Sequence, residues 1–395
     1  MSFSRRRYPS KATLGPALVL ALAASALVSP RTSAAAHKFL MYIGTYTEHG
    51  SQGIYVCSFD AQKNVWGIPR LATPSSQPSF LAIAPGQRFL YAVNELNSFN
   101  GKATGAVSAF HIVRNSGILQ PLNEVSSLGP GAVYITLDRS GRFALVANYD
   151  QGSVVVFALQ QDGSIGESTS FVQHAGSSVN HKRQKGPHAH GIALSPDNHF
   201  ALVADLGIDQ ILVYPFDAAK GALGAARVIK TDAGAGPRHL AFGKDGRFVY
   251  VVNELSSTVA VYSYDKNDGA MAAVQTISTL PEYISPEIRK LSTAAEIAMV
   301  PSGDFLYTTN RGDDSVAVFA IDPANGTLRL VEIKPTEGKR PRGFAIDPTG
   351  QWLMAANQDS DNIVEFRIDK KTGKLTASGL RVEVFTPVAL DFVPL

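Results

Sequence analysis

Short apolar runs separated by polar turns recur along almost the whole chain. In residues 237–280, PRHLAF is a short apolar segment, FVYVVN is rich in β-branched residues, and TVAVYSYD alternates between apolar and polar positions. A period of two with many Val, Thr and Tyr residues is typical of β-strands. A fourth run, AMAAVQTIST, follows a hairpin turn at Asp268-Gly269. The pattern therefore predicts units of four antiparallel strands.

The second strand of this unit occurs seven times, each time ending in a turn residue. These turn residues are Gly44, Asn94, Asn148, Asp205, Asn253, Asn310 and Asn357. The copies follow one another at intervals of about 52 residues, which is typical of four-stranded propeller blades. We therefore predict an all-β fold, a seven-bladed β-propeller, as one domain over residues 37–395.

The two ends of this domain predict how the ring closes. The tail PVALDFVPL (387–395) resembles the first strands PRHLAF and PRGFAI, but no second strand follows it. The domain itself starts at a second strand, KFLMYIGTY, with no first strand before it. We expect the tail to pair with residues 39–46 as the inner strand of that blade, because closure removes two exposed sheet edges.

Residues 1–36 have a different composition from the rest. Arg5, Arg6 and Arg7 precede an apolar stretch at 17–28, and the small residues at 34–36 suit cleavage. This is the pattern of a secretory signal peptide, with an apolar stretch too short to span a membrane. The arginines are also typical of a twin-arginine signal. We expect an exported protein, periplasmic or secreted; an uncleaved N-terminal anchor is the alternative.

The charge of the remaining chain argues against nucleic acid as a partner. Residues 1–36 hold five Lys and Arg residues and no acid, so their removal changes the formal net charge from +3 to −2. A weakly acidic chain does not have the basic footprint of a nucleic-acid-binding protein. Cys57 is the only cysteine and lies in the apolar run IYVCSFD, so we expect a core residue and no internal disulfide.

Strand direction places two sets of side chains at one rim of the ring. The first strand of a blade runs to the far face and the second returns, so the residue 15 before each turn residue lies near the residue one after it. The earlier positions hold Ser79, Val133, His190, Arg238, Ala295 and Arg342. The later positions hold Thr45, Glu95, Tyr149, Leu206, Glu254, Arg311 and Gln358.

Five of these rim residues form a cluster that suits chemistry on an anion. The cluster falls on four consecutive blades and consists of His190, Arg238, Glu254, Arg311 and Arg342. Arginines bind carboxylates or phosphates, while a histidine and a glutamate can transfer protons. Solvated charges at a wide channel mouth are the alternative. We expect the turn Asn residues and Asp205 to be structural, with side chains bonded to the following backbone.

Other candidate constellations are less specific. His188 and His190 point to the same side of a strand, but no carboxylate or cysteine stands at ligand spacing, so we expect no metal. The sequence has neither a Gly-rich phosphate loop nor a G-x-S-x-G motif, and we expect no cofactor. Ser195 lies at the opposite end of its strand and is a poor nucleophile candidate.

Two connections at the rim, 176–187 and 281–293, are long enough to fold over the cleft. The first contains Lys182, Arg183 and Lys185, which either meet an anionic substrate or remain in a mobile, solvated loop.

Several phrases resemble the lactonase family of seven-bladed propellers, which includes propeller-type 6-phosphogluconolactonases and fungal carboxy-muconate lactonizing enzymes. They are YIGTYT, PHAHGIALSPD, GPRHLAF, VVNEL, TTNRGDDSVAVF and PRGFAIDP, and the resemblance spans residues 39–395. It implies metal-free chemistry on a small-molecule lactone or its open acid. The site motifs of the muconate enzymes fall on His190, Arg238, Glu254 and Arg311.

We therefore predict a lactone hydrolase similar to 6-phosphogluconolactonase. In this hypothesis Glu254 is the general base, Arg238 and Arg311 hold the carboxylate and the oxyanion, and His190 protonates the leaving ring oxygen. The expected substrate-binding residues are Arg342, His188 and Glu95. The alternatives are a lactonizing cyclase acting on a muconate-like diacid and a non-catalytic exported propeller that serves as a binding or scaffold module. An export signal also departs from cytosolic sugar-phosphate metabolism, which makes another lactone an alternative substrate.

Overall fold

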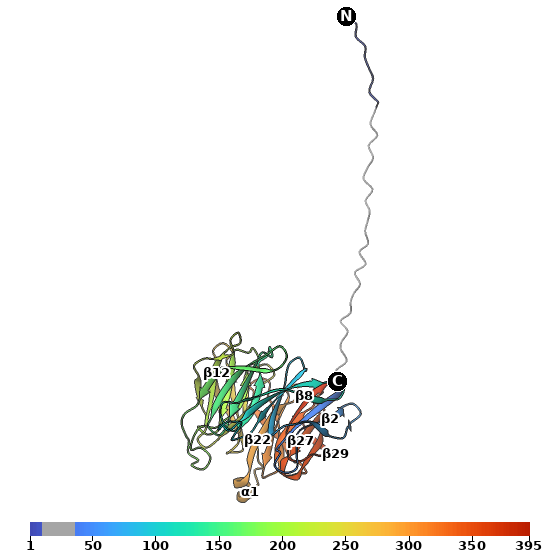
Figure 1. The fold of residues 1–395 in the computed structure, drawn as a ribbon. Helices are drawn as coiled ribbons and strands as arrows, with labels where there is room; N and C mark the ends of the chain where they lie inside the picture. Colours follow the sequence, from blue (N-terminus) through green and yellow to red (C-terminus); the bar gives the residue numbers. More distant parts are fainter. Residues whose placement is uncertain (10–35) are drawn as a thin grey trace. The chain divides into compact units, whose positions relative to one another are not determined.

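Seven antiparallel β-sheets surround a common axis in residues 36–395 (Figure 1). The computed structural model describes residues 1–9 and 36–395. The expected signal peptide falls mainly on residues 10–35 and so lies outside the described residues. The innermost strands of successive sheets contact one another around the axis. The C-terminal strand contacts the innermost strands of the sheets on both of its sides, so the ring is closed.

The first blade is built from both ends of the domain. Its strands are β1 (Lys38–Thr45), β2 (Gly53–Asp60), β3 (Val65–Trp66), β4 (Arg70–Pro74) and the C-terminal β30 (Pro387–Pro394). Blade two contains β5 (Pro78–Ile83), β6 (Phe89–Asn94), β7 (Ala106–Val113) and β8 (Ile118–Ser126). Blade three contains β9 (Ala132–Leu137), β10 (Phe143–Asn148), β11 (Ser153–Leu159) and β12 (Ile165–Gln173).

The remaining blades follow the same order from the axis outward. Blade four contains β13 (Ala189–Leu194), β14 (Phe200–Asp205), β15 (Gln210–Asp217), β16 (Ala222–Leu223) and β17 (Arg227–Lys230). Blade five contains β18 (Pro237–Phe242), β19 (Phe248–Asn253), β20 (Thr258–Tyr264) and β21 (Met271–Ser278). Blade six contains β22 (Thr293–Met299), β23 (Phe305–Arg311), β24 (Ser315–Ile321) and β25 (Leu328–Pro335). Blade seven contains β26 (Pro341–Ile346), β27 (Trp352–Asn357), β28 (Asn362–Ile368) and β29 (Leu375–Glu383).

Two short helices lie in the connections, α1 (Pro286–Leu291) and the 3₁₀ turn η1 (Gln358–Ser360). Pro286 at the start of α1 has the fixed φ that a first helical turn requires, and Ser285 caps the helix by accepting the N–H of Ile288. The described residues contain no helix that is both long enough and apolar enough to cross a membrane.

The predicted ring closure is confirmed by the pairing of β1 with β30. These strands are antiparallel, with Phe39 opposite Pro394 and Thr45 opposite Pro387. The N–H of Leu395 also donates to the carbonyl of Lys38 at 2.9 Å. The C-terminal strand thereby pairs the backbone groups on the inner side of β1, which would otherwise face the axis without partners.

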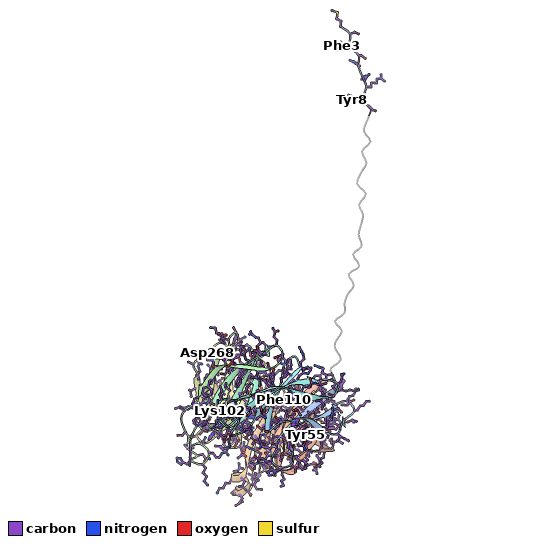
Figure 2. The ribbon with its side chains drawn as sticks, viewed as in Figure 1. Phe3, Tyr8, Tyr55, Lys102, Phe110 and Asp268 are labelled. Atoms are coloured by element: carbon purple, nitrogen blue, oxygen red, sulfur yellow. The ribbon has the colours of Figure 1, made fainter. Side chains whose placement is uncertain are left out.

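The hydrophobic core is divided among the junctions between neighbouring blades. Seven clusters of buried side chains are found in the described residues, one for each junction. Between blades one and two, for example, Tyr42 and Ile54 pack against Leu90 and Phe110, which is labelled in Figure 2. Alternate residues of each strand face opposite neighbours, so both faces of a blade are apolar. Cys57 is buried in the junction between blades seven and one, as predicted.

The hairpin glycines also connect blades. The hydroxyl of Tyr250 in blade five donates to the carbonyl of Gly326 in blade six at 3.0 Å, and Tyr91 does the same to Gly163 at 2.9 Å. Gly326 has a φ of +74°, and a Cβ there would collide with the ring of Phe248. Glycine therefore serves both the turn and the close approach of the neighbouring blade.

The turn Asn residues bond in directions that the sequence did not predict. The side-chain amide of Asn148 donates to the carbonyl of Ser127 at 2.9 Å and to Oγ of Ser153 at 3.1 Å. Asn310 repeats this pattern with the carbonyl of Thr279 and the hydroxyl of Ser315. The carbonyls belong to the connection that arrives from the preceding blade. These side chains therefore join neighbouring blades instead of bonding to the following backbone.

Candidate functional site

A polar cavity of about 370 Å³ opens where the first strands begin and the second strands end. The rim residues inferred from strand direction supply most of its wall, and the two long connections and Arg340, which precedes β26, supply the rest. The lining residues are Glu95, Val133, Tyr149, Arg183, His190, Glu254, Leu291, Thr293, Arg311, Arg340 and Arg342.

Glu254 is held by three arginines from three different segments. Its Oε2 lies 2.9 Å from Nη2 of Arg311 and 3.2 Å from Nε of Arg238, while its Oε1 lies 2.6 Å from Nη2 of Arg183. The side chains of Glu254, Arg238 and Arg311 are all buried. Glu254 directly follows β19, so its position is set by the pairing within blade five.

The arginines decide the protonation state of Glu254. Burial raises the pKa of this carboxyl, but the charges of Arg311, Arg238 and Arg183 outweigh the effect and hold the pKa well below the usual range of a glutamate. Burial, with Arg311 and Arg342 nearby, lowers the pKa of Arg238 to about 10, so this guanidinium still carries its charge at neutral pH. Glu254 is therefore ionised at neutral pH, and its charge is paired with the neighbouring arginines.

His190 enters the same cavity from β13. Its side chain is buried, and its Nδ1 has no hydrogen-bond partner among the described residues. Burial and then the charge of Arg238 hold the pKa of His190 well below its ordinary value. At neutral pH the imidazole is therefore uncharged and able to accept a proton.

Glu95 forms a second, smaller ion cluster at the rim. Its Oε2 accepts the hydroxyl of Tyr46 at 2.7 Å and lies 3.6 Å from Nη2 of Arg342. The guanidinium of Arg342 also lies over the ring of Tyr46, 5.2 Å from its centroid. Both predicted substrate-binding residues, Glu95 and Arg342, thus line the cavity.

Tyr46 was missed because the rim position of blade one was misassigned by one residue. Thr45 pairs with Pro387 as Asn94 pairs with Pro78, so Thr45 occupies the Asn position and Tyr46 the rim position. Gly44 resembles a turn residue in sequence, but a Cβ there would collide with the carbonyl of Pro78. Its small size serves close packing of blade two, and the rim assignment of Thr45 is corrected to Tyr46.

His188 lies beside the cavity and supports it indirectly. Its ring stacks on that of Tyr149 with 4.4 Å between centroids, and its Nδ1 lies 2.7 Å from the carbonyl of Tyr149. Tyr149 in turn lines the cavity and receives a bond from Arg183 at 3.0 Å. His188 itself does not line the cavity, and its predicted substrate-binding role stays a prediction; Tyr149 is the residue of this pair at the cavity wall.

Aromatic rings pack beneath the cavity. Phe80 stacks on Tyr134 with 4.2 Å between centroids, and His239 lies 4.7 Å from Tyr134 and 5.0 Å from His190. Nδ1 of His239 is 2.9 Å from Oε1 of Glu296. Burial lowers the pKa of His239 to about 4, so this ring is neutral as well. The strand pattern did not indicate Glu296, because it sits in a bulge of β22 where pairing shifts between Ala294 and Ile297.

Asp205 differs from the turn Asn residues because its partner is a histidine. Its Oδ2 lies 2.6 Å from Nδ1 of His174, and Nε2 of that ring is 2.9 Å from the hydroxyl of Tyr214. Its Oδ1 accepts the N–H of His188 at 2.7 Å. The carboxylate of Asp205 accepts hydrogen bonds at the position where the side-chain amides of Asn148 and Asn310 donate them. This buried network fixes the start of β13, the strand that carries His190.

No group of three or more His, Cys, Asp and Glu side chains within residues 1–9 and 36–395 has a geometry suited to hold a metal ion. His188 and His190 are not joined by a third His, Cys, Asp or Glu side chain at metal-ligand geometry in these residues. Catalysis without a metal remains a prediction.

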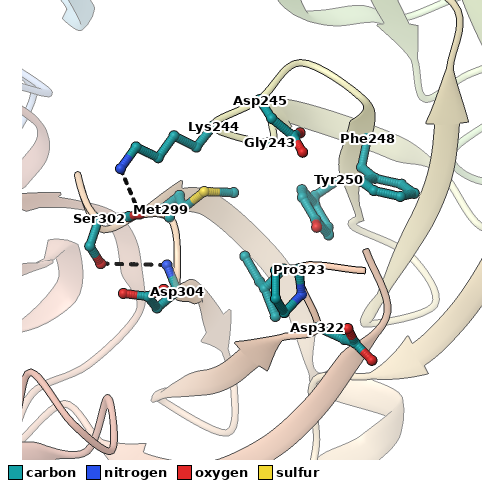
Figure 3. A pocket seen from close by; sticks show the side chains of 12 residues that line it. Gly243, Lys244, Asp245, Phe248, Tyr250, Met299, Ser302, Asp304, Asp322 and Pro323 are labelled. Carbon is teal, nitrogen blue, oxygen red and sulfur yellow. Dashed lines mark hydrogen bonds between the residues drawn. The ribbon is translucent and has the colours of Figure 1, made fainter. Parts of the chain in front are cut away.

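A second cavity of about 370 Å³ lies between blades five and six (Figure 3). It is lined by the turns after β18 and β22, which are at the ends of blades five and six opposite to Arg238, Glu254 and Arg311. Its lysine, Lys244, donates to the carbonyl of Ser302 at 3.1 Å. Its acids include Asp245, which pairs with Arg247 at the exposed surface. The charged side chains that are buried, Glu254 and Arg311 among them, belong to the polar cavity, so we assign the functional site to the polar cavity.

Comparison with known proteins identifies relatives along nearly the whole described domain. Residues 40–392 match the family model described as lactonase, 7-bladed beta-propeller. The chain is 35% identical to a 6-phosphogluconolactonase of Bacillus subtilis over 78% of this chain and 85% of that protein. The chain is 34% identical to a 6-phosphogluconolactonase of Formosa agariphila over 78% of this chain and 86% of that protein. The structure of a periplasmic gluconolactonase of Pseudomonas aeruginosa superposes with a TM-score of 0.83 and 35% identity, covering 90% of this chain and 99% of that one.

Proposed function

Because the chain belongs to the lactonase family of seven-bladed β-propellers, we propose that it hydrolyses a sugar lactone to its open acid in the polar cavity. One observation carries the proposal: neutral His190 lines the same cavity as Glu254, which is surrounded by Arg183, Arg238 and Arg311. A proton acceptor beside a cluster of fixed cations is what attack of water on an ester carbonyl requires.

The arginines stabilise the charge that develops on the lactone. As water adds to the carbonyl carbon, negative charge moves onto the carbonyl oxygen, and Arg311, which lines the cavity, offers a buried guanidinium group to it. Arg238 does not line the cavity and pairs with Glu254 next to it. Their ion pairs with Glu254 fix them in place before substrate binds, so little reorganisation is needed during the reaction. A preorganised cation in a buried site acts more strongly than one in water.

The geometry favours a role for His190 different from the one expected from sequence. We expected Glu254 to be the base and His190 the acid. The pKa values of both groups are lowered, so basicity does not separate them. Both oxygens of Glu254 are occupied by guanidinium groups, whereas the uncharged imidazole of His190 lines the cavity and can take the proton of the attacking water. The resulting imidazolium then returns this proton to the ring oxygen as the carbon–oxygen bond breaks. Glu254 acts as the counter-ion that positions the arginines.

The relatives indicate the kind of lactone. The names of the similar proteins specify 6-phosphogluconolactone and gluconolactone hydrolysis, so we propose a gluconolactone-type substrate. Four arginines and only two glutamates line the cavity, which favours an anionic substrate over a neutral one.

We also propose that the protein is exported. The charged start and short apolar stretch of residues 1–36 support this, and one relative of known structure is named as periplasmic. A fusion of residues 1–36 to a reporter enzyme should direct the reporter to the periplasm or the medium; retention of the reporter in the cytoplasm would contradict export.

The activity is tested with purified protein and a panel of phosphorylated and unphosphorylated sugar lactones. Proton release is followed against a blank without protein, because δ-lactones also open spontaneously, and the assay is repeated with EDTA. We expect turnover above the blank that EDTA does not reduce. The absence of turnover with every lactone would overturn the proposal, and ring closure of a muconate-like diacid would indicate the cyclase instead.

A further inference from the structure

The connection 176–187 delivers a charged side chain to the cavity. Nη2 of Arg183 lies 2.6 Å from Oε1 of Glu254 and 3.0 Å from the hydroxyl of Tyr149. Arg183 occupies neither the start of a first strand nor the end of a second strand, the two rim positions that strand pairing determines. Its presence in the cavity depends on the fold of a loop.

That loop is anchored by buried polar groups. Gln184 is fully buried, its Nε2 donates to the carbonyl of Leu206 at 2.8 Å, and its Oε1 accepts the N–H of Asn180 at 3.0 Å. The hydroxyl of Ser178 donates to Asp209, which also accepts the N–H of Gly236 at 2.7 Å. Since buried hydrogen bonds of this kind are costly to break, the segment holds Arg183 in a defined position.

Arg183 differs from the deeper arginines in what remains free. The side chains of Arg238 and Arg311 are 3% and 7% exposed, whereas that of Arg183 is 40% exposed. Both contacts of Arg183 use Nη2, so the donors at Nη1 and Nε are left for another partner. Arg183 therefore stands at the outer part of the cavity with unused hydrogen-bonding capacity.

A second arginine lines the cavity from a distant blade. Arg340 precedes β26 of blade seven, whereas Arg183 precedes β13 of blade four, so the two enter from well-separated parts of the ring. Arg340 is exposed, and its Nε is 4.0 Å from Asp359, an ion pair that contributes little in water. The outer part of the cavity thus carries positive charge that nearby carboxylates only partly balance.

We propose that Arg183 binds the anionic substituent of the lactone, a phosphate or carboxylate remote from the lactone carbonyl, and so determines the preference for anionic over neutral lactones. This rests on the proposed function. The reacting carbonyl lies against the buried arginines, and the anionic end reaches the mouth. Arg183 contributes its positive charge and the N–H donors at Nη1 and Nε, which suit phosphate and carboxylate oxygens.

The test compares Arg183→Gln with Lys182→Gln, a variant that removes a like charge from an exposed position of the same loop. In R183Q the ratio of kcat/KM for a phosphorylated sugar lactone to that for the unphosphorylated lactone should fall about ten- to hundredfold, the range for losing hydrogen bonds to a charged group. A loss that is common to both lactones reports the ion pair of Arg183 with Glu254. K182Q should resemble the wild type with both. Equal losses on both lactones, or no loss in R183Q, would overturn the proposal.

A binding measurement separates this proposal from the proposed function. Inorganic phosphate should raise the Tm of the wild type and of K182Q but not that of R183Q. If no lactone is hydrolysed yet this pattern is found, the activity is wrong and the anion site stands. If lactones are hydrolysed but phosphate stabilises R183Q as well as the wild type, the role of Arg183 is wrong. Partial recovery of the phosphate effect in Arg183→Lys would support a charge contact.

Discussion

The carboxylate of Glu254 lies 2.9 Å from Nη2 of Arg311, although the two residues belong to different blades. Glu254 follows the second strand of blade five and Arg311 ends that of blade six. The same carboxylate meets Arg238 and Arg183, so one residue holds the arginines of the cavity together. Its replacement should change both the local charge and the position of the groups that we propose to be catalytic.

Glu254→Gln should lower kcat/KM by about 10²–10⁴-fold. The amide cannot balance three guanidinium groups, and breaking a buried ion pair on one side costs about 3–5 kcal/mol of folding free energy. We therefore expect a lower Tm as well as lost turnover, measured by thermal unfolding and by proton release. An unchanged Tm would contradict the role of Glu254 as the counter-ion of the three arginines, because the substitution removes the charge that balances them.

The matched control for this variant must lie outside the cavity. Glu95→Gln is unsuitable, because Glu95 pairs with Arg342 and Tyr46 at the same site. Glu167→Gln removes the same charge from an exposed position on the outer strand of blade three. Its activity and Tm should match the wild type; a similar loss in both variants would mean that overall charge, not the arginine cluster, is responsible.

Activity should persist at pH values below the ordinary pKa of histidine. The pKa of His190 is lowered, so the neutral form that accepts a proton is retained as the pH falls through about 6.5. The acid limb of the kcat/KM profile should therefore lie below pH 6.5, and His190→Gln should remove that limb together with most of the activity. A limb above pH 6.5 would contradict a buried, neutral His190.

Asp391→Asn should stabilise the protein at high pH. Burial raises the pKa of Asp391 on the innermost strand β30 to about 7, from 3.8 in the unfolded chain. Between these values the folded state binds more protons than the unfolded state, so the free energy of unfolding falls as pH rises from about 4 to about 7. Asparagine removes the charge and can still accept the N–H of Phe392, which lies 2.8 Å from the carboxylate.

Urea unfolding at two pH values tests this change. We expect Asp391→Asn to gain about 1–2 kcal/mol at pH 8 and little at pH 4.5, where the aspartic acid is already neutral. Asp232→Asn, at an exposed position, is the control and should show no such difference. Equal effects of Asp391→Asn at both pH values would show that its charge is not the cause.

Removal of residues 387–395 should destabilise the whole ring. The deletion leaves the inner edge of β1 without its partner and uncovers side chains that pack in the same cluster as the deleted Val393, such as the buried Leu40 and Leu81. Because each blade packs on two neighbours, loss of one inner strand exposes both adjoining cores. We expect a large fall in Tm by thermal unfolding; an unchanged Tm would contradict a contribution of closure to stability.

The repeat by itself determined the fold and most of the deep site. Seven second strands at similar intervals predict a closed ring of similar blades, and strand pairing then brings His190, Arg238, Glu254 and Arg311 to one rim. Backbone pairing between strands is periodic, so the number of residues between two positions predicts whether their side chains lie at the same end of a blade. The count was wrong in blade one, where Gly44 is required by packing and not by a turn.

Only the tertiary structure decided the loops and the protonation states. The sequence left Arg183 either solvated or in the site, and buried contacts of Gln184 and Asp209 with other segments settle its position. Likewise, His190 and Glu254 have ordinary pKa values as isolated side chains. Their pKa shifts arise from burial and from arginines on other blades. A local sequence pattern does not encode the distances to these arginines.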